Sequence, residues 1–350
     1  MKTKYTAIDL FSGCGGLTLG LKLAGFKVLA AIEKDTLAVQ TYKANHADVV
    51  VCHDDIVAVK AGSLRKRLNL AVGELDLLAG CPPCQGFSAL RTRNGATQKR
   101  DKRNGLITEM MRFTRAFRPK TVMMENVPGL AEHWSFKKLC RDLRNLGYRV
   151  EWDIKDARYY GVPQRRKRLI LVAGHRFDVP LAKETNNIKT VWEAIGGLKA
   201  PGHSRDKLQN LTENRSEKVL SLIRAIPKDG GSRTDLPKSW QLACHQRTDG
   251  FKDIYGRMAW HEPAPTITGG CFNPSKGRFL HPEANRAITL REAAILQSFP
   301  RRYRFPADRS KESIALMIGN ALPPTFIRRH ASEIAKSLAN AKARSRRAAR

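Results

Sequence analysis

Short apolar runs alternate with segments of helical spacing through the first half of the chain. The runs have the length of buried strands, and the segments between them repeat apolar residues every three or four positions. This alternation predicts a doubly wound α/β fold, in which a parallel sheet carries helices on both faces. The predicted strands are 6–11, 27–33, 47–52, 75–80, 120–127, 148–156 and 168–174, and the helices between them are 17–25, 36–46, 106–117 and 135–147.

The pattern changes near residue 180. From 181 to 304 proline, glycine, asparagine and charged residues are intermixed, until helical spacing returns at 290–299 and 311–322. A chain of 350 residues with 42% apolar content is long enough to form two domains. We expect one domain over 1–180 and a smaller, irregular domain over 181–304.

The charge is strongly one-sided. There are 63 Lys and Arg residues against 32 Asp and Glu residues, a formal net charge of +31. Such an excess fits a polyanion partner, and nucleic acid is the first candidate. Part of the charge lies in the segment from Ile334 onward, which has six Lys and Arg residues and no acid. We expect this segment to be a frayed helix or disordered, and to add non-specific attraction to phosphate.

The sequence shows no membrane or secretion signal. It has no apolar run of about 18 residues, and its N-terminus runs into a strand pattern without the apolar core of a signal peptide. The seven cysteines are scattered along the chain. We therefore expect no membrane contact, and a reducing cytoplasmic location with free thiols.

Glycines follow the first predicted strand, and an acid follows the second. Ligands of an open parallel sheet lie outside the carboxyl ends of its strands, where the turn 11–16 (FSGCGG) and Glu33 fall. Such a turn lets backbone approach a ligand, and the acid can hold ribose hydroxyls. Thr18 breaks the G-x-G-x-x-G pattern of pyrophosphate sites, so a nucleoside without phosphates, such as S-adenosylmethionine, fits better. Asp55 and Ile56, after the third strand, are placed to meet an adenine. A plain tight turn with a surface acid is the alternative.

The stretch GCPPCQGFS follows the fourth strand and holds two cysteines, Cys81 and Cys84. A zinc site needs two further ligands at suitable spacing, and the other five cysteines form no second C-x-x-C pair. A redox pair is expected at a helix N-terminus in a thioredoxin-like unit, whereas two prolines stand between these cysteines. A packed turn and the seat of a nucleophile are the interpretations that remain.

Charged side chains follow the next strands. Glu125 and Asn126 end the apolar fifth strand, where a carboxyl group is placed to donate a proton. Arg166 and Arg168 alternate onto one side of the strand that follows them, and two guanidinium groups together suit a phosphate or a carboxylate. An ordinary strand-end acid and a solvated basic strand end are the alternatives.

In this order along the chain, these stretches resemble the DNA (cytosine-5)-methyltransferases. The resemblance implies a Rossmann-like methyltransferase sheet that uses S-adenosylmethionine, with 181–304 as the target-recognition domain. It also implies methyl transfer to C5 of a cytosine within a specific double-stranded DNA sequence. The motifs are DLFSGCGG at 9–16, Glu33, GCPPCQGFS at 80–88, MENV at 124–127, QRRKR at 164–168, TLREAAILQSFP at 289–300 and GNALPP at 319–324.

The resemblance also implies the catalytic residues. Cys84 would attack C6 of a cytosine that has been flipped out of the duplex. Glu125 would contact N3 and supply a proton, and Arg166 would lie near the cytosine O2. Arg168 and Asn126 are expected in the same site, whereas Cys81 is expected to be a packing residue.

The cofactor implied by the resemblance is S-adenosylmethionine, without a metal. The resemblance implies that Asn320 folds back beside the first strand, so that 305–350 joins 1–180 in one cofactor-binding domain. The residues expected at the cofactor are Phe11, Ser12, Gly13, Gly15, Gly16, Leu17, Glu33, Asp55, Ile56, Pro83, Leu106 and Asn320.

The DNA contacts implied by the resemblance begin with a mobile basic loop at 86–106, which would close over the phosphates. We expect a monomer associated with the nucleoid that modifies DNA, either protecting it from a restriction endonuclease or acting alone. The same chemistry on RNA and an inactive DNA-binding homologue are the rival interpretations. The residues expected at DNA are Arg91, Arg93, Arg100, Arg103, Gln164, Arg233, Arg247 and Arg257.

Overall fold

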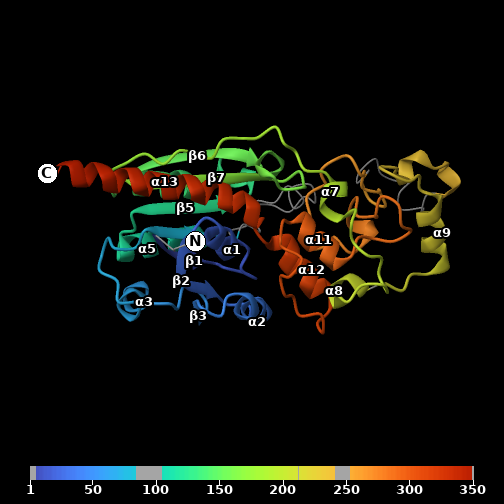
Figure 1. The fold of residues 1–350 in the computed structure, drawn as a ribbon, viewed down its shortest axis with the longest axis horizontal. Coiled ribbons are helices and arrows are strands. Elements are labelled where there is room, and N and C mark those ends of the chain that lie inside the picture. The colour runs from blue at the N-terminus through green and yellow to red at the C-terminus, as the bar shows by residue number, and fades with distance from the viewer. Residues whose placement is uncertain (1–4, 84–104, 212, 241–252, 349–350) are drawn as a thin grey trace. The chain divides into compact units, whose positions relative to one another are not determined.

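The computed structural model of the chain describes residues 5–83, 105–211, 213–240 and 253–348. The chain forms two compact units (Figure 1), and Asn320 and the rest of 305–323 belong to the second of them. The assignment of the two units to cofactor binding and target recognition stays a prediction. Unit 1 comprises Met1–Asp156, Lys167–Glu184 and Pro324–Arg350, and unit 2 comprises Ala157–Arg166 and Thr185–Pro323.

Unit 1 is built on a seven-stranded sheet. Its strands are β1 Tyr5–Leu10, β2 Phe26–Glu33, β3 Val50–His53, β4 Leu77–Gly80, β5 Thr121–Asn126, β6 Tyr148–Asp156 and β7 Lys167–His175. They lie in the order β3-β2-β1-β4-β5-β7-β6, which confirms the α/β fold. Strands β1 to β5 pair in parallel, whereas β7 is antiparallel to both β5 and β6. The apolar pattern does not reveal this reversal, because a strand buried on both faces has a similar composition in either direction.

Helices cover both faces of this sheet (Figure 1). They are α1 Gly16–Leu23, α2 Thr36–Asn45, α3 Ala61–Arg67, α5 Ile107–Phe117, α6 Trp134–Asn145 and α13 Pro324–Ala348, with a 3-10 turn η2 at Pro128–Leu130. Helices α3, α5 and α6 pack with the sheet in one core cluster. At the opposite face α1 packs on α13 and contacts α2 through the hydroxyls of Thr18 and Tyr42.

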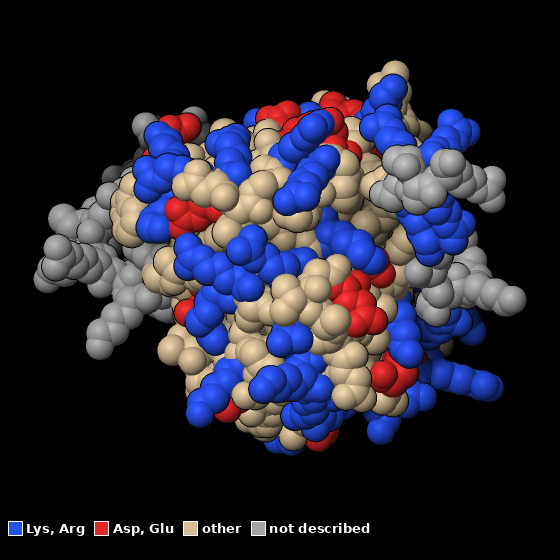
Figure 2. Space-filling model, turned by 90° about the vertical axis from the view of Figure 1, so that its left-hand side faces the viewer, with Lys and Arg blue, Asp and Glu red and all other residues tan. Residues whose placement is uncertain are grey.

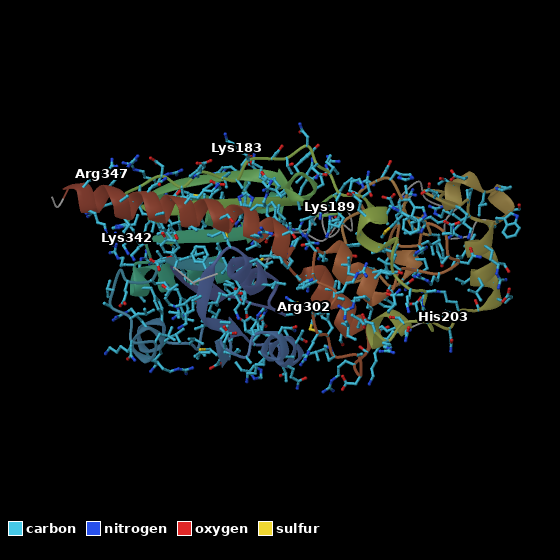
Figure 3. The ribbon with its side chains drawn as sticks, viewed as in Figure 1. Lys183, Lys189, His203, Arg302, Lys342 and Arg347 are labelled. Atoms are coloured by element: carbon cyan, nitrogen blue, oxygen red, sulfur yellow. The ribbon has the colours of Figure 1, made fainter. Side chains whose placement is uncertain are left out.

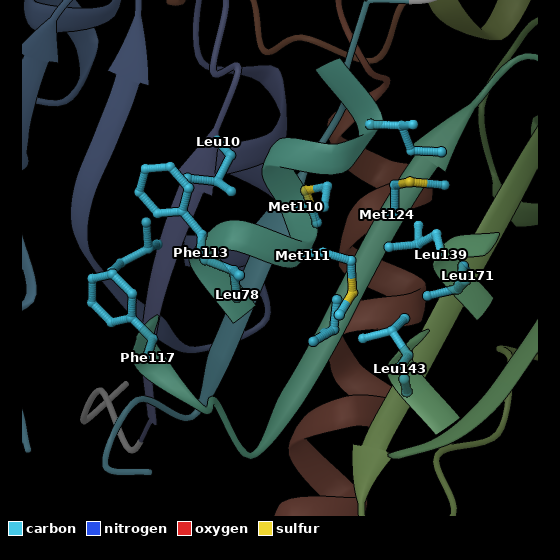
Figure 4. Close-up of a cluster of buried hydrophobic side chains, with 14 of the residues drawn as sticks. Leu10, Leu78, Met110, Met111, Phe113, Phe117, Met124, Leu139, Leu143 and Leu171 are labelled. Atoms are coloured by element: carbon cyan, nitrogen blue, oxygen red, sulfur yellow. The ribbon is translucent and has the colours of Figure 1, made fainter. Parts of the chain in front are cut away.

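The main core lies between the sheet and α5 (Figure 4). Met110, Phe113 and Phe117 recur at helical spacing and are fully buried against strand residues such as Leu10 and Leu78. Burial of each such side chain contributes about 1.5–3 kcal/mol relative to exposure. The apolar face predicted for this helix is therefore the face that anchors β1, β4 and β5 side by side.

Unit 2 contains short helices joined by long irregular segments. A small apolar cluster around Ile223 and Tyr255 is supplemented by the fully buried side chain of Arg257. Its elements are η3 Ala157–Tyr160, α7 Val191–Ile195, α8 Lys207–Asn210, α9 Glu217–Ala225, η4 Arg233–Asp235, η5 Lys238–Trp240, η6 Pro274–Lys276, α11 Leu290–Leu296 and α12 Lys311–Asn320.

Helix α13 carries the basic C-terminal segment. It continues without a break to Ala348, so within the described residues the segment is helical rather than disordered. Its last buried apolar side chain is Leu338, and Lys342 and Arg347 lie on the turns beyond (Figure 3). No helix in the described parts of the chain has the length and apolar character needed to cross a bilayer.

The packing of α1 on α13 allows a test of the fold. A Cβ atom at Gly20 would lie 2.5 Å from Ile327 Cβ and 2.7 Å from the Pro324 carbonyl oxygen. We expect Gly20→Ala to lower the free energy of unfolding by about 1–3 kcal/mol, because backbone must shift to admit the methyl group. Urea denaturation of the full chain measures this difference.

Gly62 is the matched control, since it also lies in a helix but a Cβ atom added there would have no neighbour within 4 Å. At Gly62 the same substitution is expected to raise the free energy of unfolding by about 0.5–1 kcal/mol through helix propensity. Equal effects at the two glycines would contradict the close contact between α1 and α13.

Candidate active site at the carboxyl edge of the sheet

The site is organised by the pairing of β1 with β4. The chain turns from β1 to β2 on one side, while β4 lies on the other side of β1. The turns that follow β1 and β4 therefore diverge, which is the arrangement that opens a ligand crevice in doubly wound sheets. Pairing continues past the strand ends, because the Cys81 amide donates to the Leu10 carbonyl at 3.2 Å.

The turn after β1 has an unusual backbone. Phe11, Gly13 and Gly15 all have positive φ, at 61°, 53° and 96°. Such a conformation is strained for phenylalanine, and strained residues of this kind cluster at functional sites. Glu33 holds the turn in place, since its Oε2 accepts the Gly13 amide at 2.8 Å.

The remaining predicted cofactor residues of unit 1 follow neighbouring strands. Asp55 accepts hydrogen bonds from the Val57 amide and the Lys34 ammonium group, which hold its pKa below the usual range. Ile56 and Ser12 are buried, and the Ser12 hydroxyl has no hydrogen-bond partner among the described residues. Leu17 is also buried, Gly16 begins α1, Leu106 is half-buried, and Pro83 is exposed. Asn320 is exposed at the end of α12 in unit 2, so its predicted place beside the first strand stays a prediction.

This edge suits a nucleoside better than a nucleotide. The turn 11–16 has no basic residue to neutralise a phosphate, and the nearby carboxylates Glu33 and Asp55 would repel one. Carboxylates accept hydrogen bonds from hydroxyl and amino groups. The donor set is therefore compatible with an uncharged ribose, an adenine and a cationic group.

Glu125 is the carboxylate at the end of β5, and its side chain is only 3% exposed. Its Oε1 lies 2.9 Å from Arg168 Nε, and its Oε2 accepts the Cys81 thiol at 3.0 Å. Arg168 reaches it because Glu125 pairs with Ile170 in the β5–β7 register, and residues two apart on a strand share a face. Burial of the carboxylate is thus compensated by a cation.

Asn126 fixes the segment after β4. Its Nδ2 donates to the Pro82 carbonyl at 2.9 Å, and its Oδ1 accepts the Val127 amide at 2.9 Å. Cys84, two residues beyond Pro82 in the chain, lies outside the described residues. The strand end that carries Glu125 therefore also holds the backbone that leads to the predicted nucleophile.

Two residues of the QRRKR stretch, Gln164 and Arg166, have side chains that are buried inside unit 2. Arg166 is 3% exposed and donates to the carbonyls of Ile267 and Gly319, both at 2.9 Å. Gln164 is fully buried; it donates to Gln297 Oε1 at 2.6 Å and accepts the Ile267 amide. The Gln164 side chain is thus engaged inside unit 2, and its predicted contact with DNA stays a prediction. The arginine beside the Glu125 carboxylate is Arg168, and the predicted place of Arg166 near the cytosine O2 stays a prediction.

Two other predicted DNA contacts are also buried. Arg257 is fully buried, and its guanidinium donates to the carbonyls of Ile223, Ile226, His281 and Ala284. Arg233 is 4% exposed. Both side chains are buried within unit 2, and their predicted contacts with DNA stay predictions. Predicted DNA contacts at Arg91, Arg93, Arg100, Arg103 and Arg247 lie outside the described residues.

A buried polar group near the turn was not predicted. Asp9, in β1, is fully buried and accepts the Thr18 hydroxyl at 2.7 Å, while that hydroxyl lies 2.7 Å from the Tyr42 hydroxyl. Burial raises the pKa of Asp9 to about 7. The signal in the sequence was an acid inside an apolar strand, which is rare unless the acid is paired.

Comparisons with known proteins agree with this geometry. The model of the C-5 cytosine-specific DNA methylase family matches residues 5–336. The chain is 35% identical to the Type II methylase M.HgiDII of Herpetosiphon aurantiacus, over 95% of each chain. It is 32% identical to the Type II methyltransferase M1.HphI of Haemophilus parahaemolyticus, over 96% of this chain and 88% of the relative.

Solved structures show the same fold. A DNA modification methyltransferase encoded in an E. coli prophage superposes with a TM-score of 0.75 at 23% identity, covering 96% of this chain and all of that one. The Dnmt2 methyltransferase of S. pombe superposes with a TM-score of 0.62 at 17% identity, covering 95% of this chain and 99% of that one. The chain belongs to the C-5 cytosine-specific DNA methylases. It is a DNA cytosine-5-methyltransferase of the restriction–modification type.

The buried Asp9 predicts a pH dependence of stability. Its pKa is about 7 in the folded chain against an ordinary value of 3.8, so the folded state holds this proton more tightly. Between about pH 4 and 7 the unfolded chain loses the proton first, and stability therefore falls as pH rises. We expect Asp9→Asn to remove this dependence.

The measurement is the difference in unfolding free energy between Asp9→Asn and the natural chain in the same buffers, so that other titrating groups cancel. Between pH 5 and pH 8 the unfolding free energy of the variant, relative to that of the natural chain, should rise on the order of 2–3 kcal/mol. A difference that stays constant with pH would show that Asp9 does not titrate in this range.

Proposed function

We propose that this enzyme transfers a methyl group from S-adenosylmethionine to C5 of a cytosine flipped out of a specific double-stranded DNA sequence, through a covalent bond between Cys84 and C6. The observation that carries the proposal is the arrangement at the end of β5. Glu125 is buried there against Arg168, and Asn126 holds the backbone that leads to Cys84. The family assignment supplies cytosine and C5 as the target.

The cofactor would be held at the carboxyl edge of β1 to β3. S-adenosylmethionine supplies a methyl group on a sulfonium when it is bound. The positive-φ turn lets backbone approach it, Glu33 accepts hydrogen bonds from the ribose hydroxyls, and Asp55 with Ile56 meets the adenine. We include Ser12, Gly16, Leu17, Pro83, Leu106 and Asn320 in this proposal.

Cys84, Glu125 and Arg168 have separate roles in the proposed methyl transfer. The Cys84 thiolate forms a bond to C6, and the ring electrons move toward N3, where Glu125 supplies a proton. C5 is then nucleophilic and takes the methyl group. A base removes the C5 proton, the N3 proton returns to Glu125, and the bond between C6 and Cys84 breaks to restore the aromatic ring. Arg168 keeps the Glu125 side chain oriented and compensates its charge throughout.

Duplex DNA would be held largely by phosphate contacts. The net charge of +31 favours them, and Figure 2 shows Lys and Arg side chains spread over one face with acids between them. Access to C5 and C6 requires base flipping, because both atoms are enclosed in the stack. We propose that Arg91, Arg93, Arg100, Arg103 and Arg247 contribute to binding.

The biological role that we propose is protection of DNA against a restriction endonuclease that reads the same sequence. The support is that relatives across the whole length of the chain are named Type II methylases. The enzyme would act as a monomer and need no direct contact with that endonuclease.

The nucleophile is tested with Cys84→Ser. We expect this variant to bind DNA but to lose methylation entirely, since a serine hydroxyl is not ionised at neutral pH. Bisulfite sequencing of plasmid DNA from cells that express each chain measures the modification and reveals the recognition sequence. Methylation that persists in the variant would refute the role of Cys84.

The two arginines are expected to fail in different ways. Arg168→Ala should lower kcat on the order of 10²-fold and also lower the unfolding free energy by about 3 kcal/mol, because Glu125 stays buried without its cation. Arg166→Ala should lower the unfolding free energy by about 3 kcal/mol without a comparable loss of kcat in the folded enzyme, because buried carbonyls lose their donor. Urea denaturation and turnover are measured on both variants. An Arg166→Ala variant that is as stable as the natural chain but inactive would show that Arg166 has a catalytic role.

A further inference from the structure

We propose that Cys81 is a positioning residue for methyl transfer, whose thiol holds one oxygen of the Glu125 carboxylate in the orientation that the reaction uses. The inference rests on the proposed role of Glu125. It assigns a function to the first cysteine of the GCPPCQGFS stretch, which was expected only to pack.

The two oxygens of Glu125 have different partners. Oε1 faces the charged Arg168 at 2.9 Å, and Oε2 accepts the thiol of Cys81 at 3.0 Å. The last torsion of a glutamate side chain is broad, so a single contact leaves the carboxylate free to rotate. Contacts at both oxygens fix the plane of the group.

The place of the thiol is set by the sheet. Gly80 pairs with Met124 in the β4–β5 register, so Cys81 and Glu125 follow at the same level. The backbone of Cys81 is held by the Leu10 carbonyl, and that of Pro82 by Asn126. Cys81 is therefore supported on both sides by strands, which is how precise sites are built.

A thiol is a suitable donor to Glu125 Oε2, because this oxygen must exchange its hydrogen-bond partner when cytosine binds. The S–H group is a weak and neutral donor, whereas the guanidinium of Arg168 is charged and binds carboxylates strongly. When cytosine enters, Oε2 can give up the thiol at little cost and hold instead the proton that it supplies to N3, while Arg168 keeps Oε1. The structure thus assigns Oε2 as the oxygen that meets the base.

The test compares Cys81→Ala and Cys81→Ser in the full chain, with single-turnover methylation of a duplex that carries the recognition sequence. We expect Cys81→Ala to reduce the rate about 10-fold, from the loss of a hydrogen bond to a charged group. The KM values for DNA and for S-adenosylmethionine should not change. Cys81→Ser retains a donor and should restore the rate to within about three-fold of the natural enzyme.

Cys140 provides the matched control, because it is a buried cysteine in α6 that packs in the main core. Cys140→Ala should lower Tm and leave the single-turnover rate of the folded enzyme unchanged. Cys81→Ala is expected to show the reverse: a lower rate with a Tm close to that of the natural enzyme.

Two results would overturn the inference: a Cys81→Ala variant as fast as the natural enzyme, or a Cys81→Ser variant as slow as Cys81→Ala. The second would mean that the thiol acts by packing. Glu125→Gln separates this failure from that of the proposed function. If Glu125→Gln is fully active, the acid itself is misassigned; if it is inactive while Cys81→Ala is normal, only the role of Cys81 is lost.

Discussion

The parallel pairing of β1 with β4 is the constraint on which the site depends. Leu10 and Gly80 end level with each other, and the bond from the Cys81 amide to the Leu10 carbonyl extends the register by one residue. Because β2 lies beside β1 and β5 beside β4, this one pairing brings the glycine turn and Glu33 to the same edge as Glu125 and Cys81. A change of register would separate the proposed cofactor side from the proposed chemistry, since each residue of slip reverses the face of every side chain.

Glu125 and Asp9 are both buried acids of this sheet, and they are accommodated differently. Glu125 has a guanidinium beside it, which compensates for removing a carboxylate from water. Asp9 has no cation beside it among the described residues; it accepts the Thr18 hydroxyl, which lies next to the Tyr42 hydroxyl, and burial raises its pKa to about 7. Because Thr18 lies in α1 and Asp9 in β1, this hydrogen bond also ties α1 to β1.

The sequence predicts what is local and misses what depends on distant contacts. Strands and helices were recognisable because burial imposes a period on apolar residues, and the turn 11–16 because it needs glycine. Which of Arg166 and Arg168 contacts Glu125 could not be predicted in this way, since the contact depends on the antiparallel register of β7 with β5. The contact of Cys81 with Glu125 likewise requires the pairing of two strands that lie 44 residues apart in the chain.

Buried arginines change the meaning of the net charge. Unit 2 has few regular elements. The guanidinium of Arg257 lies in its interior and donates to carbonyl groups that no helix or strand satisfies. Arg166 does the same for Gly319, and Arg291 binds Tyr303 and Asp206. These guanidinium groups hold an irregular fold together and are not available to phosphate. The net charge of +31 therefore overstates the positive charge on the surface of the chain.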